Sequence, residues 1–322
     1  MQIIPVFFSI DDAYAPFLAV TIASIKDNAS PHYAYRIHIL TDNLSEENRL
    51  RLSSLAAPGF EITFVPLAEK LAHMGADARL RRHCFQAFSS LAIYFRLFIP
   101  QLFPQYDKGI YLDADIVVPG DLSQLWEEPL GNGLIGACAD YSIQHIAPFM
   151  RYIDRYVGVD HRNYVNSGVL LLNMKRLREV DMAGRFLRWM NRYHFPTVAP
   201  DQDYLNALCW NAIHYLDPNW NAMPGDRVRE FENPQIIHFN LNTKPWLNEK
   251  VPGDEVFWKY AAHSGFEAEI RARRSAFLRD PGAMRRYNEG IDALVRMAVA
   301  LTPSATSFRT IIKSRQELRL CS

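Results

Sequence analysis

The chain has 322 residues, of which 49% are hydrophobic and 22% are charged, and its formal net charge is zero. This composition is typical of a globular protein with a large buried core. The balanced charge gives no field that would favour nucleic acid, and four cysteines without a CxxC pair argue against a zinc ribbon or a disulfide framework.

The first part of the chain alternates between strand and helix patterns. Period-two apolar runs predict strands, and apolar residues at i, i+4 and i+7 predict helices between them. This order is typical of a parallel sheet with covered faces, so we predict an α/β fold. The expected elements are a strand at 2–10, a helix from 14, a strand at 35–40, a helix from 46 and a strand at 60–67.

The middle of the chain continues the alternation, and the pattern changes near its end. Beyond about residue 265 the sheet pattern stops and Arg-rich helical segments follow. We therefore expect a catalytic unit at 1–265 and a basic helical segment at 266–322. The middle elements are a helix at 89–103, strands within 108–122, 133–140 and 164–174, a helix at 177–194, a helix opening at 201 and a strand at 234–240.

The C-terminal segment is strongly basic. From Glu267 onward it has eleven basic and six acidic residues, a net charge of +5, so the remaining chain carries −5. Interleaved apolar residues such as Phe277 and Leu294 would let this segment lie on an anionic bilayer, but it could equally pack as a helical hairpin on the rest of the chain. The sequence shows neither a signal peptide nor a spanning apolar run, which predicts a cytoplasmic protein, with peripheral contact to the inner membrane face left open.

The stretch at 108–122 places two carboxylates directly after an apolar strand. Asp113 and Asp115 flank the small Ala114, and residues i and i+2 of a strand point to the same face. Such a pair forms a hard oxygen site for Mg²⁺ or Mn²⁺ together with ligand phosphates. The first strand brings Asp11 and Asp12 to the same edge, where α/β sheets bind ligands. Alternatively, these four acids cap helices or close turns.

Seven separated motifs carry a resemblance to a known family. In order they read FFSIDDAYAPFLAVTIASI, YFRLFIP, GIYLDADIVV, LWEEPLG, VNSGVLLLNM, DQDYLN and HFNLNTKPW. Over residues 2–248 they resemble family 8 glycosyltransferases. The resemblance implies a GT-A fold, which is a Rossmann-like α/β domain with a mixed, mainly parallel sheet. It also implies a retaining hexosyltransferase that uses UDP-galactose or UDP-glucose with Mn²⁺, or Mg²⁺, and a saccharide or glycolipid acceptor, as in lipopolysaccharide synthesis.

The resemblance also assigns individual residues. Asp113, Asp115 and His238 match the metal ligands, and an imidazole beside two carboxylates favours Mn²⁺ over Mg²⁺. Lys244 matches a lysine that reaches the diphosphate, where a point charge suits a leaving group that becomes more negative. The residues matched around the nucleotide and donor sugar are Asp11, Asp12, Tyr14, Arg96, Ala114 and Asn166. Those matched at the reaction centre, beside Lys244, are Gln202, Asp201 and Asp140.

The residue matched beside the anomeric carbon is Gln202. A neutral amide is a poor nucleophile, so the resemblance favours a front-face displacement over the double displacement of retaining glycosidases. In that scheme the leaving phosphate oxygen accepts the proton of the acceptor hydroxyl. Asp201 and Asp203 leave a carboxylate nucleophile open.

The sequence departs from the family pattern at two positions, and two other functions remain open. Ala13 replaces a usual asparagine, and Leu241 stands where a glycine usually lets the backbone approach phosphate. Both changes would fit a nucleotide-sugar-binding module without turnover. The segment DADIV also resembles the nucleophile motif of haloacid-dehalogenase-type phosphatases, although those acids normally end the first strand of the chain.

Overall fold

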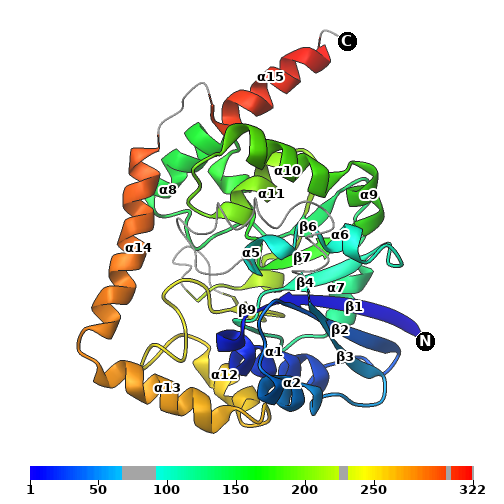
Figure 1. Cartoon of the computed structure of the whole chain (residues 1–322), viewed down its shortest axis with the longest axis vertical. Helices are drawn as coiled ribbons and strands as arrows, with labels where there is room; N and C mark the ends of the chain where they lie inside the picture. The colour runs from blue at the N-terminus through cyan, green and yellow to red at the C-terminus, as the bar shows by residue number, and fades with distance from the viewer. Residues whose placement is uncertain (67–91, 225–230, 302–305, 321–322) are drawn as a thin grey trace.

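In a computed structural model, which describes residues 1–66, 92–224, 231–301 and 306–320, the chain is built around a seven-stranded sheet (Figure 1). The strand order is β3-β2-β1-β4-β7-β6-β8. Only β7 runs antiparallel to its neighbours, so the predicted mixed, mainly parallel sheet is confirmed. The strands are β1 (Gln2–Ser9), β2 (Tyr33–Thr41), β3 (Phe60–Pro66), β4 (Gly109–Leu112), β6 (Ile135–Ala137), β7 (Val169–Leu172) and β8 (Ile213–Tyr215).

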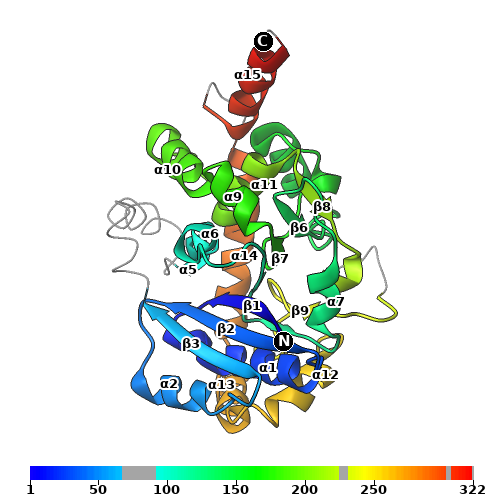
Figure 2. The same ribbon diagram turned by 90° about the vertical axis from the view of Figure 1, so that its right-hand side faces the viewer.

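The central strands β4 and β7 and most of β1 are buried on both faces, which explains why these strands are mainly apolar. Along β1, Phe7 belongs to one core and Phe8 to the other, because successive side chains point to opposite faces. Helices α1 (Ala15–Asp27), α2 (Glu46–Ser53) and α12 (Asp254–Ala261) lie on one side of β1 to β3 (Figure 2). The opposite side carries α5 (Ala92–Phe95), α6 (Ile99–Leu102), α9 (Met174–Glu179), α10 (Met182–Tyr193) and α11 (Pro200–Cys209).

Two expected helices are broken in the structure. The segment at 177–194 is not one helix, because Asp181 adopts φ 49° between α9 and α10. The segment at 89–103 forms the short helices α5 and α6 in its described part, with Pro100 in the first turn of α6. Arg96 lies in the turn between them, and residues 89–91 lie outside the described residues. The second break leaves Arg96 in a turn rather than within a helix.

A small second sheet connects two distant parts of the chain. Strand β5 (Ile116–Val117) pairs antiparallel with β9 (Ile237–His238), and Ile116 stands opposite His238. The strand expected at 234–240 is therefore only two residues long. This short strand is still important, because it brings residue 238 beside the acids that follow β4.

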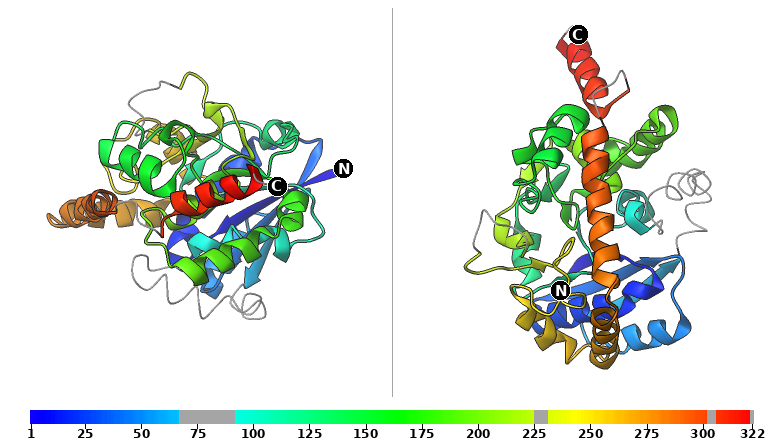
Figure 3. Two further views of the ribbon diagram at one scale, coloured as in Figure 1. Left: turned by 90° about the horizontal axis from the view of Figure 1, so that it is seen from above. Right: turned by 90° about the vertical axis from the view of Figure 1, so that its left-hand side faces the viewer.

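The basic C-terminal segment is helical, as predicted, and packs on the rest of the chain. It contains α13 (Glu267–Arg279), α14 (Ala283–Ala300) and α15 (Phe308–Leu320). Helix α13 packs on α1, and α14 runs along one side of the molecule against α8 (Ala147–Tyr152) (Figure 3). The division at residue 265 stays a prediction. Within the described ranges, every helix is too short or too polar to cross a membrane.

The start of α15 reaches the core. Phe308 is fully buried, with its ring centroid 4.0 Å from that of Phe195 and 4.9 Å from that of Tyr204. Phe308 thus completes an aromatic cluster whose other members are Tyr156, Trp189, Phe195 and Tyr204. The basic segment is in this respect part of the folded body.

We expect Phe308→Ala to lower the free energy of unfolding by about 3–5 kcal/mol, because it removes a buried ring from a packed aromatic cluster. Urea unfolding followed by circular dichroism measures this. The control is Val299→Ala on α14, whose side chain is 61% exposed, and which should cost less than about 0.5 kcal/mol. Equal stabilities for the two variants would contradict the contribution of α15 to the core.

Candidate active site

The two acids after β4 lie at the carboxyl end of the sheet. The Asp113 N–H donates to the carbonyl of Gly168 at 2.8 Å, which ties the first acid to the start of β7. Asp115 lies in the turn between β4 and β5. Thr21 Oγ1 donates to the carbonyl of Ile116 at 2.7 Å, so α1 fixes the end of that turn. These contacts fix the backbone on both sides of the two acids.

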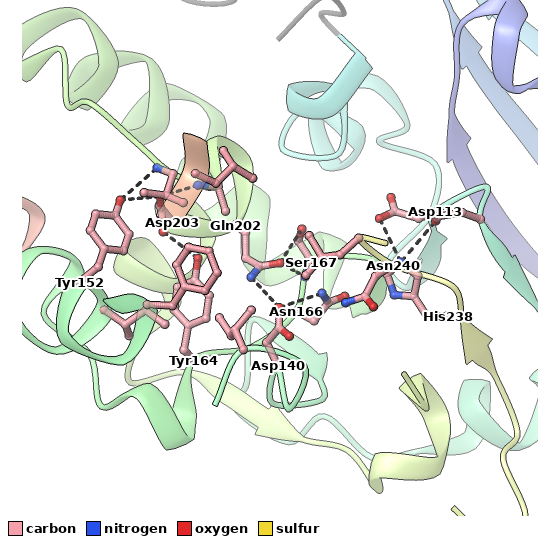
Figure 4. Close-up of a pocket in the computed structure, with 18 residues that line it drawn as sticks. Asp113, Asp140, Tyr152, Tyr164, Asn166, Ser167, Gln202, Asp203, His238 and Asn240 are labelled. Atoms are coloured by element: carbon pink, nitrogen blue, oxygen red, sulfur yellow. Dashed lines mark hydrogen bonds and ion pairs between the residues drawn. The ribbon is translucent and has the colours of Figure 1, made fainter. Parts of the chain in front are cut away.

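Three predicted metal ligands come together here. Asp113, Asp115 and His238 each offer one ligand atom, and these atoms lie within 4.8 Å of one another (Figure 4). His238 Nε2 lies 3.3 Å from an oxygen of Asp115 and 4.0 Å from an oxygen of Asp113. Two carboxylates and one imidazole nitrogen are a donor set that fits a divalent cation. Their role as metal ligands stays a prediction.

A chain of hydrogen bonds decides which nitrogen of His238 is free. The Asp140 carboxylate accepts from Asn166 Nδ2 at 3.0 Å, so Asn166 Oδ1 is the acceptor for Asn221 Nδ2 at 3.0 Å. Asn221 Oδ1 must then accept from His238 Nδ1 at 3.0 Å. This leaves the lone pair of Nε2 facing the two acids, as a metal ligand requires.

Gly168 is required by the closeness of these side chains. A Cβ at this position would lie 2.4 Å from His238 Cε1 and 2.7 Å from Asp113 Oδ2. Its N–H also donates to Asn166 Oδ1 at 2.9 Å. The glycine of VNSGV therefore makes room for the three clustered residues.

Arg96 links the first acid to α11. Its guanidinium nitrogens lie 2.9 Å from Asp113 Oδ1 and 3.1 Å from Asp201 Oδ2, and a third donates to the Ser167 carbonyl at 2.7 Å. Burial would lower the pKa of Arg96, but Asp113 and Asp201 together hold it above its ordinary value. Arg96 thus forms ion pairs with both acids and places a permanent positive charge beside the cluster.

Lys244 supplies a second positive charge from the loop after β9. Its ammonium forms an ion pair with Asp115 and is nearly buried. Burial would raise the pKa of Asp115, but the positive charge of Lys244 holds it below its ordinary value. The second acid therefore stays ionised.

The predicted reaction-centre residues form one network. Asp140 Oδ2 accepts from Gln202 Nε2 at 3.0 Å, and Gln202 Oε1 accepts from the Ser167 N–H at 3.0 Å. Ser167 Oγ in turn donates to Asp201 Oδ2 at 2.8 Å. The amide of Gln202 is thereby fixed in one orientation between Asp140 and Ser167 (Figure 4).

The three residues that follow β1 already have structural contacts. Asp11 Oδ1 accepts from the Tyr14 N–H at 3.2 Å and caps the short turn Asp12–Tyr14. Asp12 Oδ1 accepts from the Ser45 N–H at 2.8 Å, which ties this turn to α2. Tyr14 is 38% exposed, and burial of its hydroxyl together with Asp115 raises its pKa. Its ring is the one of these groups most available to a ligand.

Both departures from the family pattern are contacted by the C-terminal helices. Leu241 keeps the left-handed conformation that favours glycine, with φ 46°, and its carbonyl accepts from the Tyr287 hydroxyl of α14. The carbonyl of Ala13 accepts from the Arg273 guanidinium of α13 at 2.8 Å. The C-terminal segment therefore holds both loops beside the acid cluster.

A cavity of about 220 Å³ opens over the network. Asp113 and His238 lie at one end and Tyr152 and Asp203 at the other (Figure 4). Asp115, Asp140, Asn166 and Gln202 also line it. The predicted site residues that do not line it are Asp11, Asp12, Tyr14, Arg96, Ala114, Asp201 and Lys244.

Asp203 is a buried carboxyl that was noticed only as an alternative nucleophile. Its oxygens accept from the hydroxyls of Tyr164 at 2.7 Å and Tyr152 at 2.8 Å, and from the Ala199 N–H at 3.1 Å. Burial raises its pKa to about 7, and the two tyrosine hydroxyls only partly oppose this. The carboxyl is therefore protonated over much of the acidic range.

Sequence reasoning missed three residues that the site depends on. Ser167 and Gly168 lie inside the quoted motif VNSGV, in which a role was predicted only for Asn166. The motif was therefore a signal that could have identified both residues. Asn221 had no comparable signal, because it lies in an unremarked segment and meets His238 only through the fold.

Comparison with known proteins gives consistent matches. Residues 5–250 match the family described as Glycosyl transferase family 8. A Haemophilus influenzae protein named as a glycosyltransferase is 30% identical over 233 residues, covering 70% of this chain and 65% of that protein, so this chain spans slightly less than two thirds of that relative. The lipopolysaccharide 1,2-glucosyltransferase of Escherichia coli K12 is 26% identical over 281 residues, covering 80% of this chain and 76% of that enzyme.

A solved structure supports the same assignment of the fold. The galactosyltransferase LgtC, in complex with donor and acceptor sugar analogs, aligns with a TM-score of 0.64 and 26% identity. The alignment covers 81% of this chain and 96% of that one. The GT-A architecture expected from the sequence is therefore confirmed.

We expect the stability of the protein to fall as pH rises from about 4 to about 7, because folded Asp203 keeps a proton that the unfolded chain has released. One such proton contributes a slope of up to about 1.4 kcal/mol per pH unit. Asp203→Asn should remove this contribution, which urea unfolding at several pH values would measure. Parallel stability curves for the two proteins would show that Asp203 is ionised throughout.

Proposed function

The chain belongs to glycosyl transferase family 8, and from that premise we propose that it transfers galactose or glucose from a UDP-hexose to a saccharide or glycolipid acceptor with retention of anomeric configuration. The observation that carries this proposal is the convergence of Asp113, Asp115 and His238 at the carboxyl end of the sheet. Ligands of α/β folds bind at this edge.

The three clustered side chains would hold Mn²⁺, with Mg²⁺ as the alternative. The nitrogen ligand supports Mn²⁺, because Mg²⁺ prefers oxygen alone. Bound there, the ion would supply Lewis-acid stabilisation of the charge on the leaving diphosphate. Asn221 keeps His238 Nε2 turned toward the acids, and Gly168 leaves space for their approach.

Lys244 and Arg96 have different electrostatic roles beside the metal ligands. The Lys244 ammonium is compact and lies on a flexible stem, so it can turn from Asp115 to a diphosphate oxygen. Arg96 is fixed between Asp113 and Asp201 and keeps both carboxylates in place. We assign Lys244 to the leaving group and Arg96 to the donor sugar and the acids around it.

The reaction we favour is a front-face displacement. The bond between C1 of the hexose and the phosphate oxygen breaks, and a bond between C1 and the acceptor oxygen forms on the same face. The proton of the acceptor hydroxyl passes to the departing phosphate oxygen. Asp140 would hold Gln202 and Asn166 against the sugar, so that catalysis rests on positioning.

The contacts of the two acids on α11 weigh against a carboxylate nucleophile. Asp201 is engaged by Arg96 and Ser167, and Asp203 by two tyrosine hydroxyls and a backbone N–H. An attacking carboxylate would have to leave these partners. Membership of the transferase family also argues against the phosphatase alternative.

The nucleotide would lie over the loop after β1. The Tyr14 ring is placed to stack on the base, while Asp11 and Asp12 order the loop and approach the ribose. Ala114 keeps the space between the two acids small. A relative named as a lipopolysaccharide 1,2-glucosyltransferase supports a cell-surface glycolipid acceptor, and we place its glycosylation on the cytoplasmic side.

The decisive measurement is UDP release from UDP-galactose and UDP-glucose with Mn²⁺ or a chelator. We expect release to depend on the metal and Asp113→Asn to lower it roughly 100-fold or more, because one ligand of the diphosphate-neutralising ion is lost. The control is Asp154→Asn, which alters an exposed cluster with Asp160 and His161 and should change little. UDP binding without UDP release would favour a binding module. UDP release that is the same with and without metal, and in wild type and Asp113→Asn, would contradict the mechanism.

We also propose peripheral contact with anionic membranes through the basic C-terminal helices. Supporting this, the arginine side chains of Arg279, Arg285 and Arg296 are exposed, whereas the partly buried apolar residues of α14 pack on the core. Contact would then be electrostatic rather than by insertion of an apolar face.

We expect the protein to cosediment with phosphatidylglycerol-containing vesicles and not with phosphatidylcholine vesicles. Each basic residue near the surface contributes about 1 kcal/mol, so Arg285→Glu with Arg296→Glu should weaken binding at least tenfold. Salt at about 0.5 M should release the protein. Equal binding to both kinds of vesicle would contradict an electrostatic attachment.

A further inference from the structure

The loop from His238 to Lys244 joins a proposed metal ligand to the lysine assigned to the diphosphate. Its first residue is fixed by the pairing of β9 with β5. Its last residue is held by the ion pair with Asp115, which Lys244 must leave when it turns to a diphosphate oxygen. The conformation of the residues between the two ends therefore decides where the ammonium can reach.

Leu241, in the middle of this loop, is its strained residue. Its φ is 46°, in the left-handed region that glycine adopts freely and that costs any other residue free energy. The residue is partly buried and lines the cavity beside the acids. A leucine persists in this conformation only when surrounding contacts hold it there.

Such a contact comes from the C-terminal helices, which meet at a corner of the molecule (Figure 1). The Tyr287 hydroxyl of α14 donates to the Leu241 carbonyl. The Tyr287 ring meets Phe277 of α13 edge to face, with ring centroids 6.4 Å apart. Helix α13 is itself tied to the loop after β1, because the Arg273 guanidinium donates to the Ala13 carbonyl at 2.8 Å. The hydroxyl that holds Leu241 is thus supported by both helices.

The Tyr287 hydroxyl also lies among the charged groups of the site. Burial raises the pKa of Tyr287, the Lys244 ammonium opposes this rise, and Tyr14 and Asp115 add to it. Electrostatic interactions of this kind fall off with distance, so these groups lie near the hydroxyl. Tyr287 is therefore close both to the lysine assigned to the diphosphate and to the ring assigned to the base.

We propose that Tyr287 is a positioning residue for UDP, because its hydrogen bond holds Leu241 in the conformation from which Lys244 meets the diphosphate. This rests on the proposed transfer from a UDP-hexose. Without the bond, only a fraction of the molecules keeps the loop in the binding conformation, and the apparent Kd rises by the inverse of that fraction. The assignment makes the C-terminal segment a functional part of the nucleotide site.

The test is the affinity of the full chain for UDP, measured by calorimetry with Mn²⁺. Tyr287→Phe removes only the hydroxyl and should raise the Kd for UDP about three- to tenfold, as expected for one lost hydrogen bond. The same substitution in a Leu241→Gly background tests the route of the effect, because glycine adopts the left-handed conformation without a contact to hold it. In that background Tyr287→Phe should raise the Kd less than about twofold.

The matched control is Tyr215→Phe. The Tyr215 hydroxyl also donates to a backbone carbonyl, that of Asn163 at 3.0 Å, and Tyr215 does not line the cavity beside the acids. This variant should lose a similar hydrogen bond while its Kd for UDP changes less than about twofold, which separates a structural effect from a binding effect. Circular dichroism confirms that each variant is folded.

Three results would overturn the assignment. Equal UDP affinity of wild type and Tyr287→Phe would mean that the hydrogen bond does not position the loop. The same loss of affinity with leucine and with glycine at position 241 would place the hydroxyl on the ligand itself. An equal loss in Tyr215→Phe would mark a general effect of a weakened fold. Failure of the wild type to bind UDP at all would instead contradict the proposed function.

Discussion

The structure depends on neutralising two carboxylates at the end of a buried strand. Asp113 and Asp115 are separated only by Ala114, and two like charges in such a place are stable only with positive partners. Arg96 and Lys244 supply these partners from segments far apart in the chain. Because each partner reaches the acids from a different element, the site can form only when the β5–β9 pairing and the turn between α5 and α6 are both in place.

A second constraint is that one carboxylate sets the direction of two separate hydrogen-bond chains. Asp140 Oδ2 orients Asn166, and through it Asn221 and the ring of His238. Asp140 Oδ1 orients Ser142, and through it Asn240. Since an ionised carboxylate can only accept, every amide downstream has one orientation. A single acid thus determines both the free nitrogen beside the acid cluster and the orientation of the Asn240 amide.

The sequence predicted the parts that are local and missed those that arise from contacts across the chain. The strands β1 to β3 and the acids after β4 follow from apolar runs and spacing, and the structure has them. The break at Asp181 was missed because a helical apolar pattern continues through it. The strand expected at 234–240 was predicted too long, because an apolar run does not show that only Ile237 and His238 pair with β5. Asn221 could not be found from spacing at all, because its meaning comes only from contact with His238.

The composition of the C-terminal segment is only a partial guide to its role in the fold. Its charge of +5 suggests an appendage, yet Phe308 enters the core and Tyr287 and Arg273 hold the loops at Leu241 and Ala13. Leu241 adopts a backbone conformation that costs a non-glycine residue about 1–2 kcal/mol, and the hydrogen bond from Tyr287 offsets part of that cost. The helices therefore support the site with the faces that point inward, and their outward arginines remain available to an anionic surface.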